Sequence, residues 1–333
     1  MRTSLRRISE ESGYSLATVS NVMNGKGSVS NKTKSKILAV ASSLGYWSEK
    51  RNTKVKLVLY KKHGKIADET PFFFSLIRGT EDTCKIHNFS FEMKTLDEES
   101  DDFDKDLDDL LHDYTSNVLL VGTEMTKMDL KKFSNTLFPI IILDNRFDNT
   151  GFTTISNENV QSTMRIVKLL HSYGMKSISF VQSKILTQNF MERQRGYEQE
   201  LVILNMYDRI NIINVSPSMQ GAYEDMKQLI QNKKLKLPEA LVVVDDLISF
   251  GVLKALQEVG YKVPEDISVF GFDDLPYGQV CNPSLSTVRV CKEELGTIGV
   301  NMFASKLYNH NVAVHCELET TLIIRDSIAK KVL

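Results

Sequence analysis

The chain has 333 residues, of which 42% are hydrophobic and 25% charged, so it is long enough to bury two or three separate cores. Its net charge of −1 hides two unlike parts, because residues 1–56 hold 11 Lys and Arg against 3 Asp and Glu, whereas the rest hold 30 against 39. No segment reaches the roughly 18 consecutive apolar residues of a membrane span, and residues 1–24 lack the apolar run of a signal peptide. We therefore expect a soluble, cytoplasmic protein.

Residues 1–46 show the pattern of a small three-helix unit. A break at residues 12–15 supplies a tight turn, and the Ser15 hydroxyl is placed to cap a helix over residues 16–23. Ser30 is placed to cap a third helix. Two short helices joined by a tight turn on a basic unit predict a helix-turn-helix that binds DNA. The core candidates are Ile8, Val19, Val22, Ile37, Val40 and Leu44.

Beyond residue 54 short apolar runs alternate with amphipathic helices, a pattern typical of parallel sheets covered on both faces. One acidic segment, residues 97–109, carries nine Asp or Glu, but Phe103, Leu107 and Leu110 recur there at helical spacing. Its carboxylates are therefore expected on the solvated face of a helix and not in a calcium loop. The expected strands are Val55–Tyr60, Val118–Val121, Ile140–Leu143, Ile178–Val181, Ile210–Val215, Leu241–Val244 and Ile267–Phe270.

Motifs spread along the chain resemble those of one regulator family. Residues 15–25 read SLATVSNVMNG, residues 263–274 read VPEDISVFGFDD, and PSLST and IRDS follow at 283–287 and 324–327. On these motifs the chain resembles the LacI/GalR family of transcriptional regulators over nearly its whole length. The resemblance implies an N-terminal all-α helix-turn-helix head joined to an α/β periplasmic-binding-protein-like (type I) body of two doubly wound parallel-sheet lobes.

The resemblance also suggests how the chain divides. The linker after the head is shorter than is usual in the family and lacks an Ala-Arg-x-x-Leu element, which leaves wedging into the minor groove in doubt. The expected parts are a DNA-binding head over 1–48, a short basic linker over 49–54, and an effector-binding and dimerisation domain over 55–333. Within that domain, lobe 1 takes about 55–155 and 286–312, and lobe 2 takes about 156–283 and 315–333.

Base contacts fall, by the same resemblance, at the start of the second helix. Leu16 and Ala17 occupy the two positions that the family uses, and Asn21 stands where relatives often carry Arg. Arg suits guanine, whereas Asn suits adenine and Leu offers apolar contact to a thymine methyl, so we expect an operator that depends less on G. The rest of the expected DNA-binding set, which mainly contacts phosphates, is Ser15, Thr18, Ser20, Arg6, Arg7, Lys26, Lys32 and Lys34.

An effector site between the two lobes is implied as well. Arg193 corresponds to the family's pocket arginine and Asp273 to its pocket carboxylate, a pair that can orient a polyhydroxylated ligand against an aromatic ring. Asp245 stands where Asn is common, and its added negative charge argues against a sugar phosphate. The full candidate set is Phe72, Phe73, Asp144, Arg193, Asp245 and Asp273.

These features predict a sequence-specific DNA-binding transcriptional regulator, a repressor by the family's habit. A small effector, expected to be a sugar, sets its affinity for a pseudo-palindromic double-stranded operator, which it binds as a homodimer. The alternatives are a sugar-responsive activator, a sugar-binding protein that does not bind DNA, and an α/β enzyme. An enzyme is disfavoured because neither GxGxxG nor GxxxxGK[ST] follows a strand. The four cysteines and six histidines are scattered, so no metal ion and no cofactor are expected.

Overall fold

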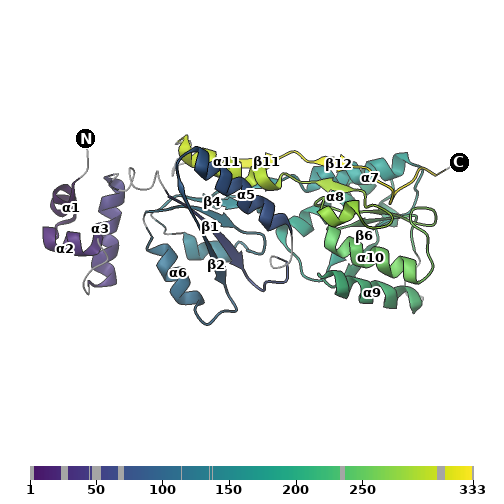
Figure 1. Ribbon diagram of the computed structural model, residues 1–333, viewed down its shortest axis with the longest axis horizontal. Helices are drawn as coiled ribbons and strands as arrows, with labels where there is room; N and C mark the ends of the chain where they lie inside the picture. The colour runs from purple at the N-terminus through teal and green to yellow at the C-terminus, as the bar shows by residue number, and fades with distance from the viewer. Residues whose placement is uncertain are drawn as a thin grey trace.

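The protein folds into a small helical head followed by two α/β lobes in a row (Figure 1). The fold class expected from the sequence is confirmed. The linker residues Trp47, Lys50 and Arg51, the Gly45 position and Lys26 lie outside the described residues. This computed structural model describes residues 4–23, 29–44, 46, 54–66, 71–113, 115–134, 136, 138–232, 237–305 and 312–331.

The head consists of α1 (Leu5–Ser12), α2 (Leu16–Met23) and α3 (Asn31–Ser43). Gly13 ends α1 in the left-handed conformation at φ 73°, which a glycine adopts without steric cost. The expected caps are confirmed, since the Thr18 amide donates to Ser15 Oγ over 3.1 Å and the Thr33 amide donates to Ser30 Oγ over 3.3 Å. The buried core is Ile8, Val19, Val22, Ile37, Leu38 and Ala41, with Val40 and Leu44 packed against it.

The first lobe is built on a six-stranded sheet in the order β11-β5-β4-β3-β1-β2, with every neighbouring pair parallel. Helices α5 and α11 pack side by side above it in Figure 1, and α6 lies below. Residues 103–109 of the acidic segment lie in α6, as expected, whereas residues 97–102 form the end of β2 and the turn before the helix. The elements are β1 (Lys54–Lys61), α5 (Pro71–Ile86), β2 (Ser90–Asp97), α6 (Phe103–Leu111), β3 (Asn117–Val121), the 3-10 helix η1 (Asp129–Phe133), β4 (Ile140–Leu143), β5 (Thr153–Asn157), α11 (Lys292–Ala304) and β11 (His315–Leu318).

Strand side chains alternate between the two faces of this sheet and fill two separate cores. In β3, Leu119 and Val121 join the core under α5 and α11, whereas Val118 and Leu120 join the core on the α6 side. The strand is apolar on both faces because successive side chains point to opposite sides. Uninterrupted apolar runs therefore mark the central strands of a sheet with both faces covered.

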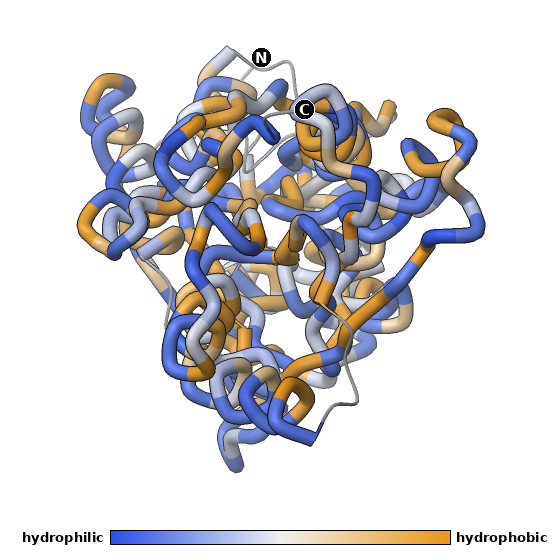
Figure 2. Tube along the Cα trace, turned by 90° about the vertical axis from the view of Figure 1, so that its right-hand side faces the viewer, coloured by the Kyte–Doolittle hydropathy of each residue, from blue (hydrophilic) through white to orange (hydrophobic). Residues whose placement is uncertain are grey.

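The second lobe holds a parallel four-stranded sheet in the order β7-β6-β8-β9. In Figure 1, α7 and α8 cover one face and α9 and α10 the other. Seen from this end, hydrophobic and hydrophilic stretches alternate along the outer helices, as amphipathic helices require (Figure 2). The elements are α7 (Val160–Ser172), β6 (Ile178–Ser183), α8 (Gln188–Ile203), η2 (Tyr207–Arg209), β7 (Ile212–Val215), α9 (Met219–Gln231), β8 (Ala240–Val243), α10 (Asp246–Glu258), β9 (Ser268–Phe270) and η3 (Pro276–Gln279).

The chain passes between the lobes after β5, before α11 and after β11. An antiparallel pair, β10 (Thr287–Arg289) with β12 (Thr321–Ile323), accompanies these crossings. Residues 315–318 differ from the expected lobe division, because β11 hydrogen-bonds to β5 and so belongs to the first-lobe sheet. The other domain bounds stay predictions. Among the helices that the structure describes, none is both long and apolar enough to span a bilayer.

Candidate DNA-binding and effector sites

One face of α2 is free of the head core. Val19 and Val22 are buried, whereas Leu16, Ala17 and Asn21 are exposed. Ala17 and Asn21 share a helix face because they are four residues apart, and Leu16 precedes them at the helix start. Leu16 keeps 46% of its surface exposed. This end of α2 therefore presents apolar side chains and an amide to solvent.

The other described DNA-binding candidates of the head lie on α1, on α2 or directly before it, and on α3. The Ser15 hydroxyl caps α2 and also pairs with Thr18 Oγ1 over 2.8 Å, so its main role is to fix the start of the helix. Thr18 and Ser20 are half-buried on α2, while Arg6 and Lys32 are exposed on the flanking helices. Arg7 is exposed as well, and Lys34 is half-buried. Three of these four basic side chains are therefore open to solvent.

A cavity of about 60 Å³, partly open to solvent, lies between the two lobes. Its walls come from the carboxyl ends of parallel strands, which is where α/β proteins place their ligands. All six effector-site candidates line it, together with eight residues that sequence reasoning did not single out. The lining is Lys65, Ile66, Phe72, Phe73, Thr123 and Asp144 from the first lobe, and Asn189, Phe190, Arg193, Pro217, Ser218, Asp245, Leu247 and Asp273 from the second.

Arg193, on α8, is held rigidly at the centre of the second-lobe wall. Its guanidinium donates to Asn159 Oδ1 over 2.9 Å, to the Val244 carbonyl over 2.7 Å and to Asp273 Oδ1 over 3.3 Å. The same group lies 3.7 Å from the centroid of the Phe272 ring. Because these contacts fix the planar guanidinium, its remaining N–H donors point in one fixed plane.

Asp144 connects the two lobes. Its Oδ2 accepts from Thr123 Oγ1 over 2.6 Å, and its Oδ1 and backbone carbonyl accept from Nδ2 of Asn189, on the opposite lobe, over 3.2 and 3.0 Å. Burial raises the pKa of the Asp144 carboxyl to about 6. The two lobes therefore share a hydrogen-bonded contact at the ligand cavity itself.

Two further carboxyls line the second-lobe wall. Asp245 Oδ1 accepts from the Ile248 amide over 2.7 Å and caps α10, while burial and the nearby Asp273 raise its pKa to about 7. Burial also raises the pKa of Asp273, which Arg193 opposes. Asp273 and Asp144 both have positive backbone dihedrals, at φ 111° and 58°, and such strained residues concentrate at ligand sites.

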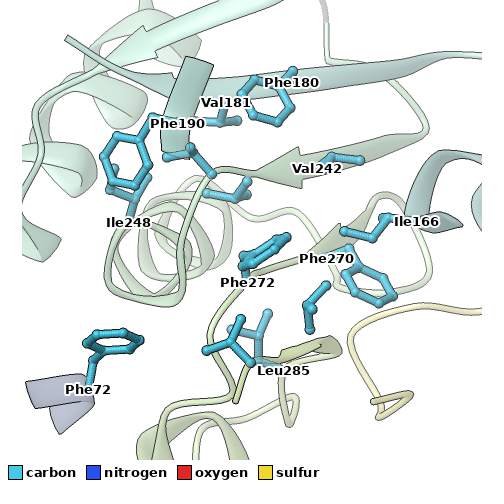
Figure 3. Close-up of a cluster of buried hydrophobic side chains, with 14 of the residues drawn as sticks. Phe72, Ile166, Phe180, Val181, Phe190, Val242, Ile248, Phe270, Phe272 and Leu285 are labelled. Carbon is cyan, nitrogen blue, oxygen red and sulfur yellow. The ribbon is translucent and has the colours of Figure 1, made fainter. Parts of the chain in front are cut away.

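An aromatic wall completes the cavity. The rings of Phe72 and Phe73, at the start of α5, meet edge to face with centroids 5.3 Å apart. Figure 3 shows Phe72 on its first-lobe helix, across from the second-lobe cluster that contains Phe190 and Phe272. A flat apolar surface opposite directed polar groups suits a ring with hydroxyls on its rim.

Sequence reasoning also missed Glu124, which supports the loop that carries the cavity-lining residues Lys65 and Ile66. Glu124 is buried, and its carboxylate accepts from the amides of Lys62, Gly64 and Ile66 over 2.9, 3.0 and 2.8 Å. These bonds hold the loop after β1 against the cavity. Its place three residues after β3 was the available signal, since strand ends meet at this edge.

A helix-turn-helix head on a body with an inter-lobe ligand cavity defines the class of ligand-responsive DNA-binding regulators. Residues 4–49 match the family model for bacterial regulatory proteins of the lacI family, and residues 167–328 match that for the periplasmic binding protein-like domain. The two ranges take in more than half of the sequence. The chain thus combines a lacI-family helix-turn-helix domain with a periplasmic-binding-protein-like domain, a pairing found in transcriptional regulators and not in enzymes.

Similar proteins span the whole chain. The PurR repressor of Histophilus somni is 24% identical over 337 residues, covering 97% of this chain and 98% of its own length. The ribose operon repressor of Haemophilus influenzae is 24% identical over 332 residues with the same coverage.

Among solved structures, the complex of the regulator CelR with cellobiose superposes with a TM-score of 0.72 at 20% identity, over 98% of this chain and all of that one. The lac repressor dimer bound to operator and the anti-inducer ONPF gives 0.70 at 19% identity, over 99% and 100%. A LacI-family regulator from Enterococcus faecium with bound ribose gives 0.71 at 20% identity, over 84% and 100%. These likenesses agree with the fold described above.

Proposed function

We propose that this protein is a transcriptional repressor that binds a pseudo-palindromic operator as a homodimer and changes its affinity when a small effector occupies the inter-lobe cavity. The observation that carries the proposal is the presence, in one chain, of an exposed base-reading face on α2 and a polar, aromatic-walled cavity between two lobes. Relatives named as repressors support the direction of control. A protein that reads genomic operators works in the cytoplasm.

The cavity chemistry supports a sugar-like effector. The guanidinium of Arg193 and the carboxylates of Asp273 and Asp144 offer donors and acceptors to hydroxyls, and Phe72 and Phe73 cover an apolar ring face. Structural neighbours carry ribose or cellobiose. We propose that Phe72, Phe73, Asp144, Arg193, Asp245 and Asp273 all contact the effector.

The homodimer is proposed to use the outer side of the second lobe. A broad hollow of about 550 Å³ lies there over α10 and η3, and three large apolar side chains at its rim, Met219, Tyr277 and Val280, are 51%, 61% and 80% exposed. Apolar surface of this kind marks a protein interface. Leu247, on α10, lines both this hollow and the effector cavity. A second copy bound at the hollow would therefore contact a helix that also reaches the effector.

Footprinting of the full-length protein on the DNA upstream of its own gene tests the function. We expect protection of a pseudo-palindrome whose halves lie about one helical turn apart. The variant Asn21→Ala should lose protection, whereas Glu11→Ala, exposed on α1, should retain it. Absence of any sequence-specific protection by the wild-type dimer at low salt would contradict the proposal.

Transcription from the footprinted promoter separates a repressor from the alternative, an activator that responds to the same effector. A repressor lowers transcript yield in a purified system as its concentration rises. An increase in yield would establish the activator instead.

A further inference from the structure

The inter-lobe cavity has more negative than positive charge in its walls. Asp144, Asp245 and Asp273 line it, against Arg193 and the exposed Lys65. Arg193 forms its ion pair with Asp273. In the part of the chain that the structure describes, no ion pair reaches the other two carboxylates, so the wall has charge that the protein leaves uncompensated.

The hydrogen bonds to these carboxylates come from neutral groups. Asp144 accepts from the Thr123 hydroxyl and the Asn189 amide, and Asp245 accepts from the backbone amide of Ile248 at the start of α10. Neutral donors orient a carboxylate but do not cancel its charge. Asp246, the next residue, is fully buried, and burial and the charges of Asp273 and Asp245 raise its pKa.

Burying unpaired carboxylates is unfavourable, and the protein shows this cost. Burial and the charge of Asp273 raise the pKa of Asp245 to about 7 and that of Asp144 to about 6, while Arg193 lowers both. Without a ligand, protons supply part of the missing positive charge near neutral pH. A cation in the cavity would replace those protons.

We infer that the effector is cationic: a small polyhydroxylated molecule with a protonated amine, such as an amino sugar, whose ammonium group neutralises Asp245 and Asp144. This inference rests on the proposed function, since it concerns the same cavity. The aromatic wall agrees with it, because the faces of Phe72, Phe73 and Phe190 attract both sugar C–H groups and ammonium groups. Arg193 and Asp273 remain available to the hydroxyls.

Isothermal titration calorimetry on the full-length protein tests the charge of the ligand directly. Matched sets are titrated at pH 6.5: glucosamine, glucose, N-acetylglucosamine and glucose 6-phosphate, and the corresponding galactose and mannose sets. In at least one set, the amino sugar should bind at least tenfold more tightly than the neutral sugar, the N-acetyl sugar and the sugar phosphate. Two buffers of different ionisation enthalpy should show that it releases protons on binding.

The inference is overturned if the neutral sugar, the N-acetyl sugar or the phosphate binds as tightly as the amine, or if no amine binds in any set. Asp245→Asn is the diagnostic variant, because Asn caps a helix as well as Asp does and the lobe should stay folded. It should bring the amine to within threefold of the neutral sugar, whereas Asp208→Asn, at an exposed position on η2, should keep the preference. An unchanged preference in Asp245→Asn would also overturn it.

Operator footprinting without ligand, on the same preparation, distinguishes failure of the cationic-effector inference from failure of the proposed function. A retained footprint together with no amine preference contradicts the cationic effector alone. Loss of the footprint contradicts the proposed function as well.

Discussion

Single residues at the cavity combine structural and binding roles. Arg193 is the clearest case, since its three hydrogen bonds join α7, β8 and the Asp273 turn, and its guanidinium packs on Phe272. Removing it would leave Asp273 and the Val244 carbonyl without their buried partner. The residue that is proposed to bind the effector therefore also fixes the second lobe.

Replacement of Arg193 by Met should lower the free energy of unfolding by about 3 kcal/mol, because it leaves a buried carboxylate unpaired. Urea denaturation followed by circular dichroism measures the change. Arg195→Met is the matched control, on the same helix but exposed, and should change the free energy by less than about 0.5 kcal/mol. Equal effects of the two variants would contradict the role given to Arg193.

The raised pKa of Asp245 makes a prediction about pH. Its pKa is about 7 when folded against about 4 when unfolded, so unfolding releases a proton between those values. The contribution of Asp245 to the free energy of unfolding should therefore fall as pH rises from 4 to 7 and level off above. The groups that face Asp245 are Asp273, which raises its pKa, and Arg193 and the Ile248 and Leu247 amides, which lower it.

Asp245→Asn removes this loss of stability. The difference in free energy of unfolding, variant minus wild type, should grow by more than about 1 kcal/mol between pH 5 and pH 8, since one pKa unit corresponds to roughly 1.4 kcal/mol. Urea denaturation at the two pH values measures it. A difference between variant and wild type that stays constant with pH would contradict the assignment.

At the scale of elements, apolar strands were predictable and polar strands were not. All seven expected apolar runs form strands, including β7 and β9 at the edges of the second-lobe sheet. The edge strand β2 was missed because Leu96 is its only fully buried residue and its sequence is largely polar. Strand β5 was missed for another reason: Thr153–Asn157 is buried but polar, and its Asn157 side chain accepts from the Cys291 amide at a lobe crossing.

The cavity was predictable only in part. Asp144 and Asp273 follow strands and carry charge, which the sequence displays directly. Thr123 reaches Asp144 from the neighbouring strand end of the same lobe, and Asn189 reaches it from the opposite lobe. Neither contact has a signal in local sequence. Sequence reasoning therefore identifies charged residues at strand ends, and the structure adds the hydrogen-bond partners that orient them.

The recognition helix α2 makes a prediction about the operator. Asn21→Arg should shift the preferred base at its contacted position from A towards G by about 1–3 kcal/mol, because a guanidinium fork matches the acceptors of guanine. Binding to operators randomised at each position, followed by sequencing, measures the shift. Arg7→Ala, at a proposed phosphate contact, should instead weaken all sequences alike and reduce the salt slope by about 1. No change of base preference in Asn21→Arg would remove Asn21 from the base-reading set.

For the whole molecule, dimerisation and DNA binding should be coupled, since two heads must reach adjacent half-sites. Val280→Asp places a charge on the exposed apolar rim of the α10 hollow and should give a monomer by light scattering, with operator affinity reduced at least tenfold. Val202→Asp, also exposed but on α8, should remain dimeric. A dimeric Val280→Asp variant would place the interface elsewhere.

Ligand control follows from the two-lobed architecture. Three chain crossings allow the lobes to move relative to each other, and the Asp144 to Asn189 hydrogen bonds lie where a ligand would bind. A ligand that favours one lobe arrangement shifts the population of dimers whose heads fit the operator.

The most direct test is therefore the coupling between the two sites. Operator affinity of the full-length dimer is measured with and without the sugar or amino sugar found by calorimetry, and the affinity for that ligand is measured with and without operator. The account predicts that both affinities change by the same factor, between about 5-fold and 150-fold, and that Asp273→Asn abolishes the change while operator binding persists. Specific operator binding that no cavity ligand alters, in either direction, would contradict it.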